Sequence, residues 1–242
     1  MTVAGRSATL PLRRPRLRPV PQEQAGPRTL RDRVRDGILD WIGDVWTCKS
    51  MLVIAGVSIV IGLATDYYCG SYVTVTPGAK VPDLILDRLP AMDLSFLFVY
   101  GYMVLLMIMF LYPTFFRVRM LHVVTIQFAM LLTVRSLFMI FTHLETPAGS
   151  VAVSFPWFFE HLYFENDMFF SGHTAMPFLG FYLFRHNRLR YVFLVGAMVM
   201  GAVVLLMHLH YSIDVFAAFF MTYCSYKMGQ RLLRKIDPTY IG

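Results

Sequence analysis

The chain has 242 residues, of which 57% are hydrophobic and only 15% are charged. An average soluble domain carries roughly 25% charged residues, so the composition excludes an ordinary soluble protein and predicts an integral membrane protein. The formal net charge of +7 is concentrated near the N-terminus, where attraction to anionic lipids explains it, so we expect no nucleic-acid partner.

The first 48 residues contain two predicted segments. Residues 1–28 are rich in Pro and Arg and lack apolar periodicity, which predicts a disordered basic tail. Over residues 29–48, apolar side chains recur at helical spacing while arginines occupy other positions on the helical wheel. This pattern predicts an interfacial amphipathic helix, for which Thr29 and Asp32 supply an N-terminal cap.

Long apolar runs follow and predict membrane spans at about 51–67, 92–112, 119–143 and 169–185, before a final apolar stretch over 189–229. As one helix, that last stretch would reach about 60 Å, twice the thickness of a hydrocarbon core. We therefore expect it to turn at its polar cluster, residues 208–214. The prediction is an all-α protein with a domain of six transmembrane helices over 49–230 and a tail over 231–242.

The distribution of basic residues predicts the orientation of these spans. Nineteen of the 22 Lys and Arg residues fall on one side, whereas the other side has Lys80 and Arg88 and an acidic 144–168 loop. Because cytoplasmic loops retain positive charge, both termini are expected in the cytoplasm. The opposite, extracytoplasmic face would be the Golgi lumen, the cell exterior or the periplasm.

Two polar motifs lie at that extracytoplasmic face. The segment Ser171-Gly172-His173 begins the predicted fourth span, and His210 and Asp214 begin the sixth. Ionisable groups are costly beside hydrocarbon, so their presence at membrane borders indicates a functional site.

The spacing of these residues suggests a chemistry. His210 and Asp214 are four residues apart, so on a helix the carboxylate can hold one ring nitrogen and leave the other as a nucleophile or base. Such a histidine can attack phosphorus and form a covalent phosphoenzyme. An ordinary histidine titrates near pH 6.5, so His173 can act as the general acid and base.

Neighbouring residues are candidate substrate ligands. At Ser171 and Gly172, free backbone N–H groups at a helix start favour phosphate, and the glycine permits close approach. Arg135 is the only basic residue in the middle of a predicted span, and it either contacts phosphate or pairs with Asp93 or another buried acid. Asp167 either orients His173 or caps the fourth span.

These segments also resemble a known family. Residues Asp167 to Thr174 (DMFFSGHT) and His210 to Val215 (HYSIDV) are similar to motifs of the sphingomyelin synthase family, within the lipid phosphate phosphatase (type 2 phosphatidic acid phosphatase) superfamily. Upstream, the segment from Val81 through Asp83 to Asp87 resembles the family's Pro-Asp segment, and the segment from Arg135 to Pro147 resembles its Arg-to-Pro segment.

The resemblance implies a six-span enzyme that moves a phospho-head-group, phosphocholine or phosphoethanolamine above all, from a glycerophospholipid to ceramide and leaves diacylglycerol. It further implies that His210 is the nucleophile, Asp214 its orienting partner and His173 the acid and base, with no cofactor and no metal. Whether the chain forms a homo-oligomer is left open.

Three alternatives stay open at this point. A lipid phosphatase or phospholipase C-type hydrolase would use water as acceptor, although Val203 and Val204 replace the Ser-Arg that the phosphatase branch carries ahead of its last histidine. A non-enzymatic lipid-binding or transport protein would use the histidines to relay protons or hold a head group. The third alternative is a metal site in which His173, His210 and Asp214 bind the ion together with Asp167.

Overall fold

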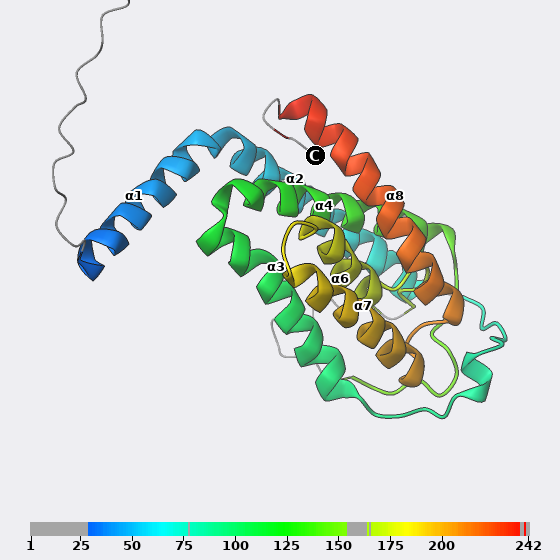
Figure 1. Ribbon diagram of the computed structural model, residues 1–242. Coiled ribbons are helices and arrows are strands. Elements are labelled where there is room, and N and C mark those ends of the chain that lie inside the picture. The colour runs from blue at the N-terminus through cyan, green and yellow to red at the C-terminus, as the bar shows by residue number, and fades with distance from the viewer. Residues whose placement is uncertain (1–28, 77, 154–163, 165, 238–239, 241–242) are drawn as a thin grey trace, which may run out of the picture. The chain divides into compact units, whose positions relative to one another are not determined.

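The computed structural model describes residues 29–76, 78–153, 164, 166–237 and 240. The predicted tail over residues 1–28 therefore lies outside the described residues. Within the described part, every regular element is helical, and a single isolated bridge pairs Ala79 with Leu144 (Figure 1). The all-α prediction is confirmed for these residues.

The helices follow one another with short connections at one end and longer ones at the other. In chain order they are α1 Leu30–Thr47, α2 Lys49–Val75, the 3-10 helix η1 Leu86–Arg88, the π-helical turn η2 Leu97–Gly101, α3 Tyr102–Phe116, α4 Val118–Phe141, α6 Gly172–Leu183, α7 Leu189–Leu206 and α8 Ser212–Ile236.

Four of the described helical segments are long and apolar enough to cross a membrane: α2, η2 with α3, α4 and α7. The chain is therefore a multi-pass membrane protein by length and composition. Helix α6 has 12 residues, about 18 Å against a hydrocarbon core of about 30 Å, and α8 carries Asp214 and several basic residues. The six-span count stays a prediction.

The chain divides into two compact units, residues 1–40 and Trp41–Gly242. The described part of the first unit is the beginning of α1, and α1 covers Leu30–Thr47 of the range 29–48 in which a helix was predicted. Thr29 and Asp32 form the predicted cap: Asp32 accepts from the Thr29 N–H and hydroxyl, and Thr29 Oγ1 accepts the Asp32 N–H. Its interfacial, amphipathic role stays a prediction.

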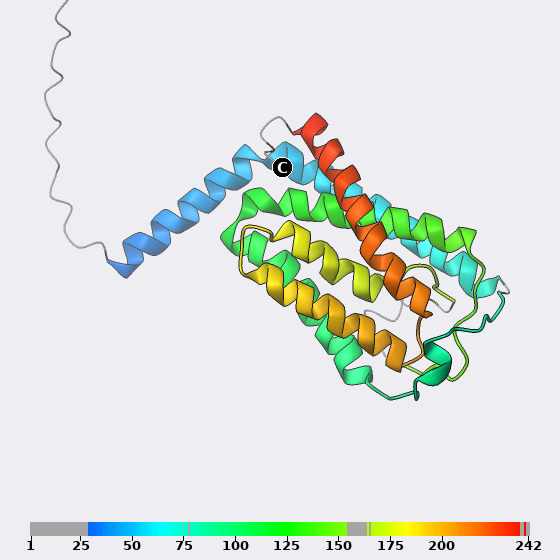
Figure 2. The same cartoon turned by 45° about the vertical axis from the view of Figure 1, so that its right-hand side comes forward.

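The second unit is built around α4, which packs against α2, α3, α6 and α8. Helices α6 and α7 lie side by side in both views (Figures 1 and 2). Large side chains that are almost completely buried fill the interior, among them Phe98, Met109, Leu131, Phe170, Leu179, Phe184, Phe193, Met200 and Met207. Close packing of such apolar groups fixes the relative positions of the helices that carry the polar motifs.

Helix α2 extends eight residues beyond its predicted end at 67. The prediction was wrong because Asp66 and the residues after it interrupt the apolar run, whereas the backbone continues as a helix to Val75. Asp66 is only 7% exposed and faces the bundle. Burial of a carboxylate in a membrane protein requires a partner.

Three connecting segments gather at the end of the bundle where α8 begins (Figure 2). Their described parts are residues 76, 78–96, 142–153, 166–171 and 207–211. Backbone hydrogen bonds join them: the Ala79 N–H donates to the His143 carbonyl, the Met92 N–H to that of Leu206, and the Val151 N–H to that of Met207. The two polar motifs are thus brought to the same end of the molecule.

The predicted turn within residues 208–214 is confirmed, because α7 ends at Leu206 and α8 begins at Ser212. No glycine marks the turn, and His208 itself takes a left-handed conformation with φ of 55°. Its ring nitrogens lie 3.1 Å from the carbonyl oxygens of Ala148 and Leu89. These contacts hold a conformation that a non-glycine residue rarely adopts.

Candidate active site

His210 and Asp214 form the predicted pair. His210 Nδ1 lies 3.3 Å from Asp214 Oδ2, and the Asp214 carboxylate is completely buried. An ionised carboxylate can only accept hydrogen bonds, so the contact fits the His210 tautomer with its proton on Nδ1, in which Nε2 keeps its lone pair. Nε2 has no hydrogen-bond partner among the described residues, which leaves it available to a substrate.

The Asp214 carboxylate is oriented by the backbone on both sides. Oδ2 also accepts the Tyr211 N–H at 3.1 Å, and Oδ1 accepts the Phe169 N–H at 3.3 Å. With these bonds made, rotation of the carboxylate away from His210 would leave buried N–H groups unpaired, which is costly. The pair is therefore preorganised by groups that themselves take no part in chemistry.

His173 lies near the start of α6 and is held by aromatic contacts. Its ring centroid is 4.1 Å from that of Phe98 and 4.4 Å from that of Tyr102. Among the described residues, none is hydrogen-bonded to the His173 ring, so both of its nitrogens are free to exchange a proton with a ligand. These aromatic contacts could not be predicted from the sequence, because Phe98 and Tyr102 belong to an ordinary apolar run.

A backbone hydrogen bond connects the two motifs. The Ser171 N–H donates to the Asp214 carbonyl at 3.1 Å, so α6 and α8 begin side by side. Ser171 occupies the N-cap position of α6 without a side-chain cap, and the Thr174 hydroxyl donates to its Oγ at 3.3 Å. The Ser171 N–H is therefore occupied, contrary to its predicted role as a phosphate donor. Among the described residues, the N–H groups of Gly172, His173 and Thr174 have no hydrogen-bond acceptor, as is usual for the first turn of a helix, and these are the donors that can meet an anion.

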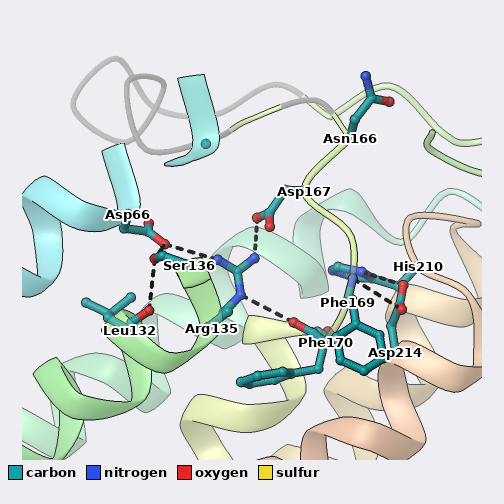
Figure 3. A network of polar contacts seen from close by, with 12 residues as sticks. Asp66, Leu132, Arg135, Ser136, Asn166, Asp167, Phe169, Phe170, His210 and Asp214 are labelled. Carbon is teal, nitrogen blue, oxygen red and sulfur yellow. Dashed lines mark hydrogen bonds and ion pairs between the residues drawn. The ribbon is translucent and has the colours of Figure 1, made fainter. Parts of the chain in front are cut away.

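Arg135 reaches this site from α4 and is almost completely buried (Figure 3). Its Nη1 donates to Asp66 Oδ1 at 3.2 Å, its Nη2 pairs with Asp167 Oδ2, and its Nε donates to the Phe170 carbonyl at 3.3 Å. The alternative of an ion pair with a buried acid is therefore observed. The predicted partner Asp93 is wrong, since that carboxylate accepts from Ser95 instead.

Asp66 is a site residue that the sequence analysis missed. Its Oδ1 accepts hydrogen bonds from Arg135 and from the Ser136 hydroxyl at 2.9 Å (Figure 3). A signal did exist, because an acid at the end of an apolar run is expected to face the interior of a bundle. It was overlooked because the predicted span ended one residue later.

Asp167 has neither of the two roles that its position suggested. Ser171 is the N-cap residue of α6, and no hydrogen bond joins Asp167 to His173 in the described part of the chain. Its carboxylate pairs with Arg135 through one oxygen, while the other, Oδ1, is buried and has no hydrogen-bond partner among the described residues. An unpaired buried acceptor is costly and is commonly completed by a ligand or water.

A cavity of about 160 Å³ opens beside these groups. Its polar end is formed by Asp66, Arg135, Asp167 and His173, and its walls are apolar, formed by Leu63, Val99, Tyr102, Met103, Leu106, Phe128, Leu132 and Met176. A site with a few polar groups at one end of an apolar cavity suits an amphipathic ligand. Within the described residues, no group of three or more His, Cys, Asp and Glu side chains could hold a metal ion.

The geometry defines a helical membrane protein with a buried His–Asp pair at the start of α8 and a largely apolar cavity that a second histidine, His173, and the buried Arg135 line. His210 and Asp214 are not among the residues that line this cavity. The family model of the PAP2 superfamily C-terminal region matches residues 166–230, which include both histidines and Asp214. This match supports the lipid phosphate phosphatase superfamily and fits a lipid phosphatase or phosphotransferase enzyme. Searches of curated proteins and of solved structures gave no match.

Proposed function

We propose that this protein is a phosphotransferase that moves phosphocholine or phosphoethanolamine from a glycerophospholipid to ceramide or a similar lipid alcohol. The observation that carries the proposal is the buried His210–Asp214 pair, whose free Nε2 is poised as a nucleophile. The apolar cavity that meets His173 supports a lipid substrate.

In the first half-reaction, His210 Nε2 attacks the phosphorus of the donor, and the bond from phosphorus to the diacylglycerol oxygen breaks. Asp214 stabilises the positive charge that develops on the imidazole. His173, as the acid, gives its proton to the departing oxygen, and diacylglycerol leaves. The head group stays on His210 as a phosphohistidine.

In the second half-reaction, His173 takes the proton of the acceptor hydroxyl, and the resulting oxygen nucleophile attacks the phosphohistidine. The phosphorus–nitrogen bond breaks and His210 is regenerated. The free N–H groups at the start of α6 and the Arg135 guanidinium, which lines the same cavity as His173, would stabilise the negative charge that develops on the phosphate oxygens.

The proposal includes six membrane spans, both termini in the cytoplasm and the site on the extracytoplasmic side. It is supported by charge: Arg117, Arg119, Arg185, Arg188 and Lys235 lie at the end of the bundle opposite the site. A positive-inside arrangement would place that end in the cytoplasm. Donor, acceptor and both lipid products would then exchange laterally with the outer leaflet.

The decisive experiment measures products. Purified protein in lipid nanodiscs is given phosphatidylcholine or phosphatidylethanolamine with a labelled acyl chain, with and without ceramide. We expect labelled diacylglycerol together with ceramide carrying the head group, and little diacylglycerol when ceramide is absent. Equal diacylglycerol release without ceramide would favour hydrolysis instead.

Gly172 provides a test of how closely the site is packed. A Cβ atom on Gly172 would lie 2.9 Å from Arg135 Nε and 3.3 Å from Cζ, and the guanidinium is held by its three partners. We expect Gly172→Ala to displace Arg135 and to lower the turnover rate by roughly 10- to 100-fold. The measurement is the initial rate of product formation.

The matched control is Gly56→Ala in α2, where an added Cβ meets nothing within 4 Å. Because alanine favours helix over glycine, this variant should keep full activity. Wild-type activity in Gly172→Ala would contradict the close approach of Arg135 to the start of α6.

A further inference from the structure

Helix α8, which follows the His210 loop, has only part of its cap from its own residues: the Asp214 side chain in the first turn accepts the Tyr211 N–H. Tyr211 occupies the N-cap position, where Ser, Thr, Asp or Asn is usual. Asp83, in the segment before η2, supplies hydrogen-bond acceptors to the next residue, Ser212. Its Oδ2 accepts the Ser212 N–H and its Oδ1 accepts the Ser212 hydroxyl, both at 2.7 Å. Asp83 thus caps α8 from 129 residues earlier in the chain.

Asp83 is itself fixed by its own segment. Its Oδ1 also accepts the N–H groups of Ile85 and Leu86, each at 2.9 Å, and its backbone N–H donates to Asp87 Oδ2 at 3.0 Å. Leu86, at the start of η1, is 2% exposed and packs in a small apolar cluster with Met168 and Tyr211. The carboxylate therefore sits on a rigid turn and is not a freely rotating surface group.

A second contact joins the same two segments. The Tyr211 hydroxyl donates to the Glu145 carbonyl at 3.1 Å and accepts the Val81 N–H at 3.3 Å. Tyr211 and Ser212 are the residues between His210 and the turn of α8 that carries Asp214. Any displacement of this short stretch would change the His210–Asp214 distance directly.

We infer that Asp83 is a positioning residue for the His210–Asp214 pair, and that it acts by holding Ser212 and so the first turn of α8. The expected effect of Asp83 on catalysis rests on the proposed function. Both carboxylate oxygens of Asp83 are occupied by protein donors, from Ser212 on one side and from its own turn on the other, so it acts through geometry and not by touching the substrate.

The charge of Asp83 suits this role. Burial raises the pKa of its carboxyl, but hydrogen bonds from the Leu86 N–H, from both Ser212 donors and from the Ile85 N–H outweigh burial and hold the pKa below its ordinary value. The carboxylate is therefore ionised at neutral pH. A negative charge at a helix N-terminus is also favourable to the helix dipole.

The test compares Asp83→Asn with a matched control, Asp93→Asn. Asp93 likewise accepts from a serine N–H and hydroxyl, those of Ser95 at 3.0 and 2.6 Å, but this serine lies in its own segment and not at the start of α8. We expect Asp83→Asn to lower kcat by roughly 10- to 100-fold with KM within about twofold, because a small misplacement of a catalytic group costs that much. Asp93→Asn should leave kcat unchanged.

Two further measurements separate positioning from a general loss of structure. Ser212→Ala, which keeps the backbone bond to Asp83, should lower kcat less, and it should add little to Asp83→Asn because both remove the same contact. Hydrogen exchange of the peptide covering residues 207–216, followed by mass spectrometry, should become faster in Asp83→Asn but not in Asp93→Asn.

An unchanged kcat in Asp83→Asn would overturn the inference, whatever the exchange measurement shows. So would a fall in kcat with exchange raised throughout the chain, which would indicate unfolding. Wild-type protein that forms no product would overturn the proposed function instead. In that case, the comparison of hydrogen exchange over residues 207–216 between Asp83→Asn and wild type would decide whether Asp83 orders this turn.

Discussion

Replacing His210 with alanine is expected to lower head-group transfer by at least about a thousandfold, because the nucleophile of a covalent mechanism has no substitute. The His210 ring is nearly buried and contacts Asp214, so the smaller side chain leaves the surrounding backbone bonds in place. The measurement is the rate of labelled diacylglycerol formation. Phosphohistidine, detected after rapid quench with radiolabelled donor, should also be absent.

The control is His143→Ala, an exposed histidine at the same end of the bundle. It contributes to the loops through its backbone carbonyl, which the substitution keeps, so the transfer rate should be unchanged. An unchanged rate in His210→Ala would refute the mechanism. Loss of turnover with intact lipid binding would instead remove support for a non-enzymatic transport protein.

Replacing Arg135 with glutamine is expected to lower the free energy of unfolding by about 3–5 kcal/mol, the usual effect of breaking a buried ion pair. Its partners Asp66 and Asp167 would be left with buried, uncompensated charge, and the Phe170 carbonyl would lose its donor. Activity should fall as well, since the segment leading to His173 is held by these bonds. Unfolding in mixed micelles measures the stability.

The matched variant is Arg119→Gln. Arg119 pairs with Asp44 at 2.7 Å, but its side chain is 67% exposed, and exposed pairs contribute less than about 1 kcal/mol. Equal stability losses in the two variants would show that Arg135 is not in a desolvated environment. Double replacement of Arg135 and Asp66 by apolar residues should recover part of the stability, because it removes both charges together.

The parts of the site that the sequence predicted are those that local spacing determines. His210 and Asp214 are four residues apart, and a helix start places such residues together whatever else surrounds them. The turn between α7 and α8 followed from a length argument alone. The side of the membrane on which the motifs lie followed from counting basic residues, and it stays a prediction.

The parts that were missed depend on contacts between distant segments. Asp66 and Arg135 are 69 residues apart, and no periodicity relates an acid at the end of one apolar run to a base in the middle of another. From the sequence, Asp83 is notable only as part of the segment that resembles the family's Pro-Asp segment, and that resemblance assigns it no role. Its function as a cap becomes visible once the 76–96 segment is placed against the start of α8.

The hydrogen bond between the Ser171 N–H and the Asp214 carbonyl has a consequence for how the site can open. It holds the starts of α6 and α8 together, so His173 and His210 are expected to move together. Separation of the two helices would break the hydrogen bond that aligns the motifs. The cavity is lined by residues of α2, η2, α3, α4 and α6 and, within the described part of the chain, by none of α8. A lipid can therefore enter and leave the cavity without separation of α6 from α8, and the alignment of the two motifs is kept while substrates exchange.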